Sequence, residues 1–237
     1  MAEEDRIMTI RKYGLAYSSD ILTVKHGFSI KGATNSNDWG ERKEFLNSVL
    51  ASNRITYVST SQVHSTKVFE YVGKELGAGD GIVYKKEEGT NQICLVVTTA
   101  DCVPVLFTDS KKQIIAAAHS GWKGTAGNIV GEVVRKMIFK GAELINIQVA
   151  IGPGVSGCCY EISGDRLLQF FESYIEQRGE KKYLNLTKVI IDQLRKAGIK
   201  KNNIDYGIFC TQCETELFDS YRREGPNRIQ MVNYISL

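Results

Sequence analysis

Residues 98–122 read TTADCVPVLFTDSKKQIIAAAHSGW and place a cysteine and a histidine at the ends of apolar segments. Ile93–Val97 precedes Cys102, and Ile114–Ala118 directly precedes His119. Short apolar runs that are bounded by turn residues are typical of buried strands. We therefore expect both side chains to leave a rigid sheet where its strands end, a position from which they can meet a ligand.

A third apolar run lies upstream of this stretch. Ile55–Thr60 has the same strand-like character and ends shortly before His64. The sequence thus predicts that His64, Cys102 and His119 converge on one site. Single histidines and cysteines more often pack in a core than bind a ligand, so the prediction depends on a fold that brings the three together.

The composition is that of an ordinary globular chain, and it narrows the classes of partner. The chain has 237 residues and a formal net charge of +3, with basic and acidic residues interleaved along its length. This charge pattern gives no reason to expect a nucleic-acid partner. No apolar run has the length of a membrane span, and no signal-peptide segment follows the charged N-terminus. We therefore expect a cytoplasmic protein with no membrane partner.

The order of the apolar segments predicts an α/β fold. We expect strands at 55–60, 68–72, 82–84, 93–98, 103–108, 113–118 and 147–151, and helices at 41–52 and 124–140. In the last third, expected helices at 164–178 and 186–197 alternate with strands at 206–209 and 229–234, while 26–32 is interpreted as a glycine-flanked turn. No linker or internal repeat interrupts the chain, so we expect a single layered domain over residues 1–237, with mixed sheets flanked by helices.

If the three residues converge, they form a good set of zinc ligands. Three protein ligands leave a fourth position for water or substrate, as in catalytic zinc sites. Zinc in such a site lowers the pKa of a bound water or polarises a substrate oxygen. One thiolate leaves the site with a net positive charge, so we expect it to attract anions. A noncatalytic module that only binds zinc would use the same ligands.

A cysteine hydrolase is an alternative interpretation of the same residues. Cys102 would be the nucleophile and a histidine the base, with Asp101 or Gln62 nearby. This arrangement leaves the second histidine without a role.

Copper is a further alternative, because two histidines and a cysteine also make the trigonal part of a blue-copper site. A multicopper laccase holds several copper centres mostly with imidazole. The chain has only His26, His64 and His119, which are too few for such centres. Copper is therefore a weaker expectation than zinc.

The segment Cys210-Thr211-Gln212-Cys213 is a CxxC motif. It could be redox-active or one half of a structural zinc site. The other half would need partners such as Cys158 and Cys159, because the chain has no second CxxC motif. The simplest interpretation is that Cys210 and Cys213 are two incidental thiols.

Residues 119–127, HSGWKGTAG, lead into the helix expected at 124–140. Free backbone N–H groups, the helix dipole and Lys123 could hold an anion at this point. The glycines equally fit tight packing of the turn on the sheet. The spacing is neither a Walker A nor a GxGxxG motif, so an ordinary nucleotide phosphate site is not indicated.

Several segments together resemble the bacterial laccase-domain family, also called the YfiH-like or polyphenol oxidoreductase family. The matching segments follow one another over residues 26–223 and read HGFS at 26–29, QVH at 62–64, GDG at 79–81, TADC at 99–102, HSGWKG at 119–124, IGP at 151–153, CCYE at 158–161 and SYRR at 220–223. The resemblance covers nearly the whole chain. It implies a layered α/β fold of the YfiH-like type, with a zinc site on His64, Cys102 and His119 in a pocket of that fold.

The resemblance also implies an activity and its substrates. The activity is purine nucleoside phosphorolysis, which acts on adenosine, inosine and methylthioadenosine together with phosphate, and adenosine deamination is a second activity. By position, Lys31, Lys123 and Arg222 are the candidates that would hold the phosphate. Lys31 and Lys123 stand where the family usually has arginine, and lysine lacks the bidentate geometry of arginine towards phosphate.

A proton shuttle for deamination is the remaining candidate role. Zinc deaminases of the cytidine type use a glutamate beside the ligand histidine, whereas here Ser65 and Thr66 follow His64. Asp101, next to Cys102, is the nearest candidate catalytic carboxylate. It is equally well interpreted as a turn or cap residue.

Overall fold

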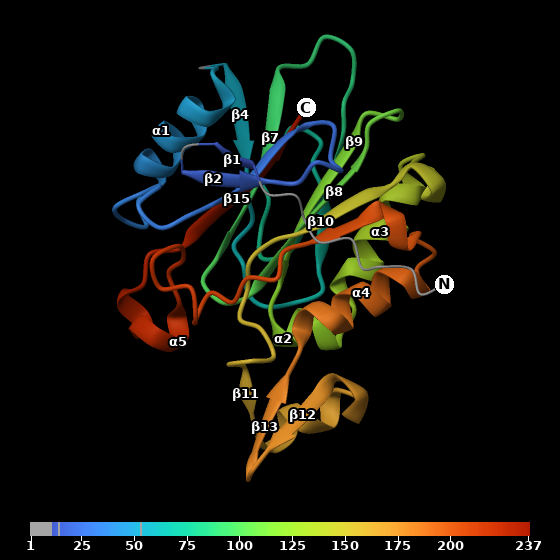
Figure 1. The fold of residues 1–237 in the computed structure, drawn as a ribbon. Helices are drawn as coiled ribbons and strands as arrows, with labels where there is room; N and C mark the ends of the chain where they lie inside the picture. The colour runs from blue at the N-terminus through green and yellow to red at the C-terminus, as the bar shows by residue number, and fades with distance from the viewer. Residues whose placement is uncertain (1–10, 14, 53) are drawn as a thin grey trace.

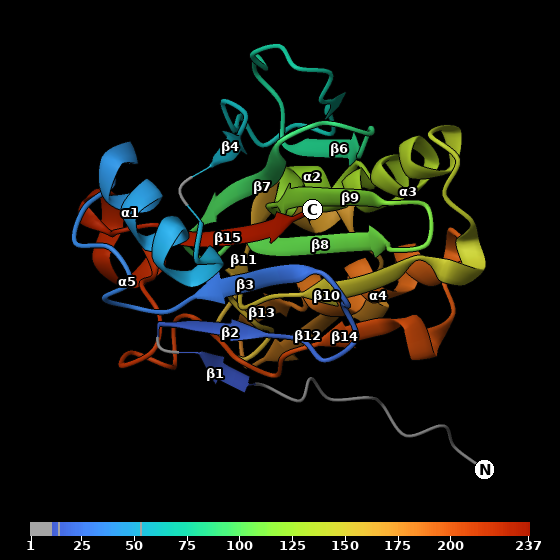
Figure 2. The same ribbon diagram turned by 90° about the horizontal axis from the view of Figure 1, so that it is seen from above.

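The computed structural model describes residues 11–13, 15–52 and 54–237. Within these residues the chain forms four layers: a helix on one side, two large mixed sheets, and a layer of helices on the other side (Figures 1 and 2). A small third sheet extends from one end of the layers (Figure 1). The predicted α/β class with mixed sheets flanked by helices is confirmed. Residues 1–10, 14 and 53, which the predicted domain includes, lie outside the described residues.

The first large sheet contains strands from the beginning, the middle and the end of the described chain. Its strand order is β1-β2-β3-β15-β7-β4, and the pairing is antiparallel except between β7 and β4. The strands are β1 Arg11–Tyr13, β2 Ala16–Ser18, β3 Lys25–Ser29, β15 Met231–Ser236, β7 Gln92–Thr99 and β4 Ile55–Val58. The last strand of the chain, β15, therefore lies inside the sheet, between β3 and β7.

The second large sheet is built around the hairpin of β8 and β9. Its order is β14-β10-β8-β9-β6-β5, with parallel pairing only at the two edges. The strands are β14 Ile204–Tyr206, β10 Gln148–Ile151, β8 Val103–Asp109, β9 Ile114–Ser120, β6 Gly81–Lys85 and β5 Val68–Glu70. In the hairpin, Pro104 lies opposite His119.

The small sheet and the helices complete the described structure. The small antiparallel sheet contains β11 Glu161–Ile162, β13 Lys181–Leu184 and β12 Ile175–Arg178. The helices are α1 Trp39–Leu50, α2 Trp122–Ala126, α3 Ile129–Phe139, α4 Leu186–Lys196 and α5 Tyr221–Glu224. Short 3-10 turns are η1 Leu144–Asn146, η2 Gly164–Gln169, η3 Glu172–Tyr174, η4 Lys201–Asn203 and η5 Gly225–Asn227. In the described part of the chain, no helix has both the length and the apolar character needed to cross a membrane.

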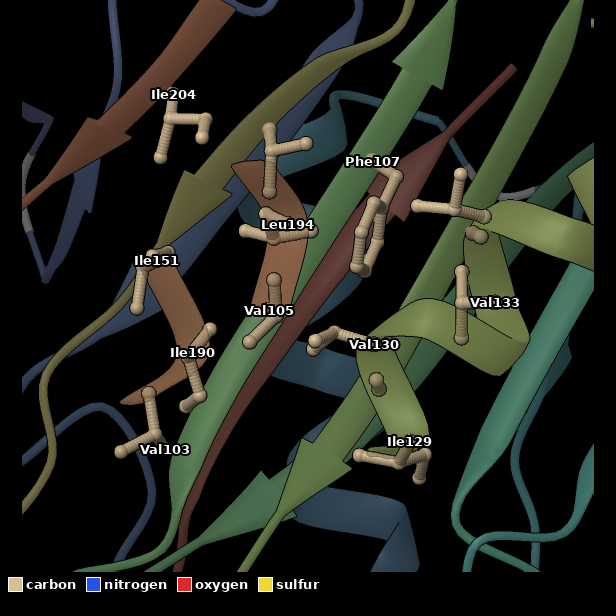
Figure 3. Packing of buried hydrophobic residues seen from close by; sticks show 14 of the residues in the cluster. Val103, Val105, Phe107, Ile129, Val130, Val133, Ile151, Ile190, Leu194 and Ile204 are labelled. Atoms are coloured by element: carbon tan, nitrogen blue, oxygen red, sulfur yellow. The ribbon is translucent and has the colours of Figure 1, made fainter. Parts of the chain in front are cut away.

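Successive side chains of the central strands point to opposite faces of their sheet and therefore belong to different hydrophobic cores. Leu95 of β7 and Leu106 of β8 face each other's sheet, whereas Val105 and Phe107 of β8 face the helices α3 and α4. Helix α1 covers the outer face of the first sheet. Figure 3 shows the core between the second sheet and the helices, which includes Val105, Phe107, Val130, Val133, Ile190 and Leu194.

Capping residues set where the three long helices begin. The side chains of Asp38, Asn128 and Asn185 accept hydrogen bonds from backbone N–H groups in the first turns of α1, α3 and α4. Such caps satisfy donors that the helix itself cannot pair. The helix predicted at 124–140 is two helices because Asn128, with a φ of 62°, takes a left-handed conformation and starts α3 anew.

Three other segments differ from the prediction. Residues 26–32 are not only a turn, because 25–29 form β3 and Phe28 is fully buried. The helix predicted at 164–178 is wrong: the segment consists of η2, η3 and β12, and its apolar residues Leu168 and Phe171 are exposed rather than packed. The strand predicted at 206–209 lies earlier, at Ile204–Tyr206, because β14 pairs there with β10, and residues 207–209 are not part of it. In each case long-range pairing decides the structure.

Candidate functional site

The ends of three strands place His64, Cys102 and His119 beside one another. His119 is the last residue but one of β9. Cys102 lies in the turn that leads from β7 of the first large sheet to β8 of the second. His64 lies in the loop between β4 and β5, strands that also belong to different sheets. The crossings between the two sheets therefore bring the three residues to one end of the layers.

The three side chains form a tight cluster. Their ligand atoms all lie within 4.8 Å of one another. The imidazole rings of His64 and His119 meet edge to face, with centroids 4.8 Å apart and planes at 74°. His119 is buried, Cys102 is partly exposed and His64 is exposed, so the cluster is open on the side of His64.

A buried carboxylate, Asp80, holds both histidines in place. Its Oδ1 accepts a hydrogen bond from His119 Nδ1 at 2.8 Å and another from the backbone N–H of His64 at 2.9 Å. Its Oδ2 accepts from the backbone N–H of Ser65 at 2.6 Å and from the Ser65 hydroxyl at 2.8 Å. Burial raises the pKa of Asp80, but the hydrogen bonds from His119 and Ser65 outweigh this effect and hold the pKa below its usual range. With Nδ1 of His119 bonded to Asp80, Nε2 is the ring nitrogen left to bind a metal ion, and a carboxylate partner of this kind is usual for metal-binding histidines.

The backbone around the cluster takes conformations that are uncommon for side-chain-bearing residues. The φ angles of His64 and Asp101 are 59° and 85°. Such values cost free energy and are found most often where function requires them. Gly121 allows the turn after β9 to approach closely, because a Cβ atom at this position would lie 2.9 Å from Cys102 Sγ and 2.9 Å from His64 Cδ2.

The pKa values of Cys102 and His119 are shifted by their neighbours. Burial raises the pKa of the Cys102 thiol, but hydrogen bonds from His119 and His64 outweigh it and lower the pKa to about 7. Burial lowers the pKa of His119, whereas Asp80 and the Cys102 sulfur raise it to about 9. The cluster therefore favours a thiolate, which is the form of cysteine that binds metal ions.

These residues fit a metal ion. Two imidazole nitrogens and a thiolate suit zinc, and the same donors suit copper. Asp80 fixes the orientation of His119 from behind. Three ligands with one open side leave room for a further ligand from solvent or substrate.

The cluster lines a cavity of about 800 Å³. This volume is in the range of small-molecule sites, roughly 300–1,000 Å³. The lining includes three aromatic residues, three arginines and three glutamines: Trp122, Tyr160, Tyr221, Arg166, Arg222, Arg228, Gln62, Gln212 and Gln230. Among the described residues, the Oε1 atom of Gln212 is buried and has no hydrogen-bond partner.

Each arginine of the cavity stacks on one of its aromatic rings. The guanidinium carbon of Arg222 lies 4.6 Å from the ring centroid of Tyr160. The corresponding distances are 5.2 Å from Arg166 to the Trp122 ring and 5.1 Å from Arg228 to the Tyr221 ring. Within the described residues none of the three guanidinium groups forms an ion pair with a carboxylate. Their charge is therefore available to an anionic ligand.

The structure separates the three cations that were expected to hold phosphate. Arg222 lines the cavity. Lys31 does not: its Nζ donates to the backbone oxygen of Thr215 at 3.4 Å and lies 3.8 Å from Glu224 Oε1. Lys123 is exposed, lies outside the cavity lining and has its Nζ 5.7 Å from the Trp122 ring centroid.

Both carboxylate oxygens of Asp101 are occupied by hydrogen bonds. Oδ1 accepts from the Thr211 hydroxyl at 2.7 Å, and Oδ2 accepts from the backbone N–H of Arg222 at 2.7 Å. Asp101 is buried and contacts the first turn of α5, so this geometry favours the cap interpretation over the proton-shuttle interpretation.

Arg166, Arg228 and Asp80 are among the site residues that were given no role from the sequence. Arg166 and Arg228 lie far along the chain from the cluster, and no local pattern distinguishes them from surface arginines. Asp80 carried a weak signal, because it lies between two glycines in the GDG segment that matches the family.

Comparison with known proteins finds a matching family and several relatives of this chain. The family model described as multi-copper polyphenol oxidoreductase laccase matches residues 31–237. A protein of Clostridium acetobutylicum named purine nucleoside phosphorylase is 37% identical over 180 residues, which cover 73% of this chain and 74% of that protein. A protein named adenosine deaminase, from an unknown prokaryotic organism, is 34% identical over 152 residues, which cover 57% of this chain and 55% of that protein.

A solved structure has the same fold. The Bacillus licheniformis hypothetical protein YfiH matches with a TM-score of 0.85 and 24% sequence identity, over 96% of this chain and 98% of that one. The predicted YfiH-like fold is thereby confirmed.

Proposed function

The chain belongs to the multi-copper polyphenol oxidoreductase laccase family, and we propose that it is a zinc-dependent purine nucleoside phosphorylase. Its substrates would be phosphate together with adenosine, inosine or methylthioadenosine. Adenosine deamination is proposed as a second activity. The relatives named purine nucleoside phosphorylase and adenosine deaminase support these two reactions.

One observation carries the proposal. The cluster of His64, Cys102 and His119 opens into a cavity that also contains three arginines stacked on aromatic rings. A nucleoside needs a flat apolar surface for its base, and phosphate needs cationic donors. The cavity offers both beside a set of metal ligands.

The proposed reaction assigns roles to these groups. In phosphorolysis a phosphate oxygen attacks the ribose carbon, and the purine leaves with the electron pair of the glycosidic bond. Arg166, Arg222 and Arg228 would hold the phosphate, since guanidinium groups bind it in bidentate fashion. A metal ion, when bound, supplies positive charge that polarises an oxygen of phosphate or substrate. Gln212, whose Oε1 lacks a partner among the described residues, would accept a hydrogen bond from the nucleoside.

Laccase chemistry in the literal sense does not fit the chain's histidines. Apart from His64 and His119, the sequence contains only His26. Both ring nitrogens of His26 are used by the backbone: Nε2 accepts from Ser19 N–H at 2.9 Å, and Nδ1 lies 2.7 Å from the oxygen of Val24. His26 is therefore not available to complete a second imidazole-rich copper centre.

Metal content and turnover of matched cysteine variants test the proposal. Cys102→Ala removes a proposed ligand, whereas Cys94→Ala removes a buried thiol in β7 that is not part of the metal-ligand cluster. We expect Cys102→Ala to hold one zinc ion fewer per chain than Cys94→Ala and to lose phosphate-dependent release of free base from inosine. Equal zinc content and equal release in the two variants would contradict the proposal.

A thiol hydrolase is the second candidate, because the lowered pKa of Cys102 also suits a nucleophile. In that case alkylation with iodoacetamide would abolish activity, while a chelator would leave it intact. Zinc-dependent phosphorolysis predicts that the chelator abolishes activity and that added zinc restores it.

A further inference from the structure

A second group of thiols lies outside the site described above. The sulfur atoms of Cys158, Cys159, Cys210 and Cys213 all lie within 4.8 Å of one another. Cys213 Sγ is 3.6 Å from Cys158 Sγ and 3.1 Å from Cys159 Sγ. Folding thus brings to the CxxC motif the two partners that a four-thiol site requires, which favours a metal site over two incidental thiols.

We propose that these four cysteines form a second metal site, which binds one zinc ion through four thiolates. Zinc takes four thiolates in a tetrahedron with bonds of about 2.3 Å, which places neighbouring sulfur atoms about 3.8 Å apart. The separations of 3.1 Å and 3.6 Å, and the upper limit of 4.8 Å for all sulfur pairs, lie on either side of that value. Two disulfides would instead need bonded sulfur pairs at about 2.05 Å.

Backbone donors support the sulfur atoms. Cys210 Sγ accepts a hydrogen bond from the backbone N–H of Ser156 at 3.5 Å, and the backbone of Gln212 and Cys213 also bonds to it. These donors offset part of the negative charge that four thiolates bring to a divalent ion.

A nearby arginine supports the other half of the cluster. Arg178 of β12 donates from Nη1 to the oxygen of Cys158 at 2.8 Å and from Nη2 to the oxygen of Gly157 at 2.6 Å. It thus fixes the turn that carries Cys158 and Cys159, while its charge is paired with Glu176 at 2.8 Å.

The site would connect two loops that form one wall of the cavity. Tyr160 directly follows Cys159, and Gln212 lies between Cys210 and Cys213; both residues line the cavity. The loops already contact each other, since Thr211 N–H donates to Gly154 oxygen at 3.1 Å. Four protein ligands leave no open position on the ion, so the role of this zinc is structural rather than catalytic.

Elemental analysis of the full-length protein, purified with zinc and a reductant, tests the second site. The double variant Cys158→Ser, Cys213→Ser should hold one zinc ion fewer per chain than wild type. Cys94→Ser, the matched control, should keep the wild-type content. Cys102→Ser should lose the ion of the other site only, so failure of the proposed function is distinguishable from failure of this inference. Wild-type zinc content in the double variant would overturn the inference.

Alkylation of the wild-type protein gives a second measurement that does not depend on the folding of a variant. In zinc-saturated protein, mass spectrometry should find the four thiols protected from iodoacetamide, and a chelator should expose them. Rapid modification of all four in the presence of saturating zinc, or a disulfide between Cys159 and Cys213, would overturn the inference.

Discussion

Asp80 is the residue on which the geometry of the candidate metal site depends. It is fully buried, and it joins the ring of His119 to the loop that carries His64. A buried donor that loses its acceptor costs about 1–3 kcal/mol. The convergence of the two histidines and the cysteine could be predicted because they follow apolar runs, whereas the role of Asp80 could not, because it depends on contacts across the fold.

Replacing Asp80 should weaken the metal site. We expect Asp80→Asn to lower zinc affinity about 10- to 100-fold, as loss of an outer-shell carboxylate usually does. Competition with a chromophoric chelator measures the change. Ser65→Ala, which removes one hydrogen bond to the same carboxylate, is the control and should have a smaller effect. Wild-type affinity in Asp80→Asn would show that the carboxylate does not support the ligands.

The metal site should be equally sensitive to replacement of Gly121, for a steric reason. Gly121→Ala would place a Cβ atom 2.9 Å from Cys102 Sγ and 2.9 Å from His64 Cδ2 and should displace both side chains. We expect loss of zinc from this site in elemental analysis, with the far-UV circular dichroism unchanged. At Gly77 the nearest atom to an added Cβ is Phe69 Cζ at 3.9 Å, so Gly77→Ala is a matched control that should keep its zinc. Equal zinc content in Gly121→Ala and Gly77→Ala would contradict this steric argument.

Arg166 is the most direct test of the proposed phosphate role. It stacks on Trp122 and has no carboxylate partner among the described residues. A hydrogen bond to a charged group is worth about 1.5–3 kcal/mol, so Arg166→Ala should raise the KM for phosphate about 10- to 100-fold. The KM for inosine should change little. Arg195→Ala, an exposed arginine of α4 outside the cavity, is the control. A rise in both KM values alike would argue against a specific phosphate contact.

At the scale of elements, the sequence predicted the central strands well and the segment after Ile162 poorly. Strands β7, β8 and β9 are largely apolar because both of their faces are buried, and such apolar runs can be recognised from the sequence. Residues 164–178 contain apolar residues at helical spacing, yet Leu168 and Phe171 are exposed and 175–178 pair with β13. Which strand pairs with this segment depends on residues that are distant in sequence, and the spacing of apolar residues does not reveal it.

The packing of α4 on the second sheet gives a prediction at this scale. Leu194 is fully buried in the core shared with Val105 and Val130 (Figure 3). Leu194→Ala should lower the free energy of unfolding by about 2–5 kcal/mol, because it leaves a cavity in a close-packed core. Its neighbour Arg195 is exposed, so Arg195→Ala should change stability by less than about 0.5 kcal/mol. Denaturant titration compares the two variants, and similar midpoints would contradict the packing described here.

At the scale of the whole molecule, the site exists because the chain crosses between two sheets. Cys102 lies at one crossing and His64 at another, and the C-terminal segment adds Arg222 and Arg228 before it returns as β15. We propose that residues 1–237 form one domain around this arrangement. The convergence of His64, Cys102 and His119 was predictable, but the cavity around them was not, because its wall comes from segments whose order in space depends on sheet topology.

Identification of the sugar product is the most direct test of the central claim. Phosphorus NMR of the zinc-loaded protein with inosine and phosphate should show ribose 1-phosphate, formed in equal amount to free hypoxanthine. The signal should vanish in Cys102→Ala and persist in Cys94→Ala. Free ribose as the sugar product, or no cleavage of the nucleoside by the zinc-loaded protein, would contradict the assignment as a purine nucleoside phosphorylase.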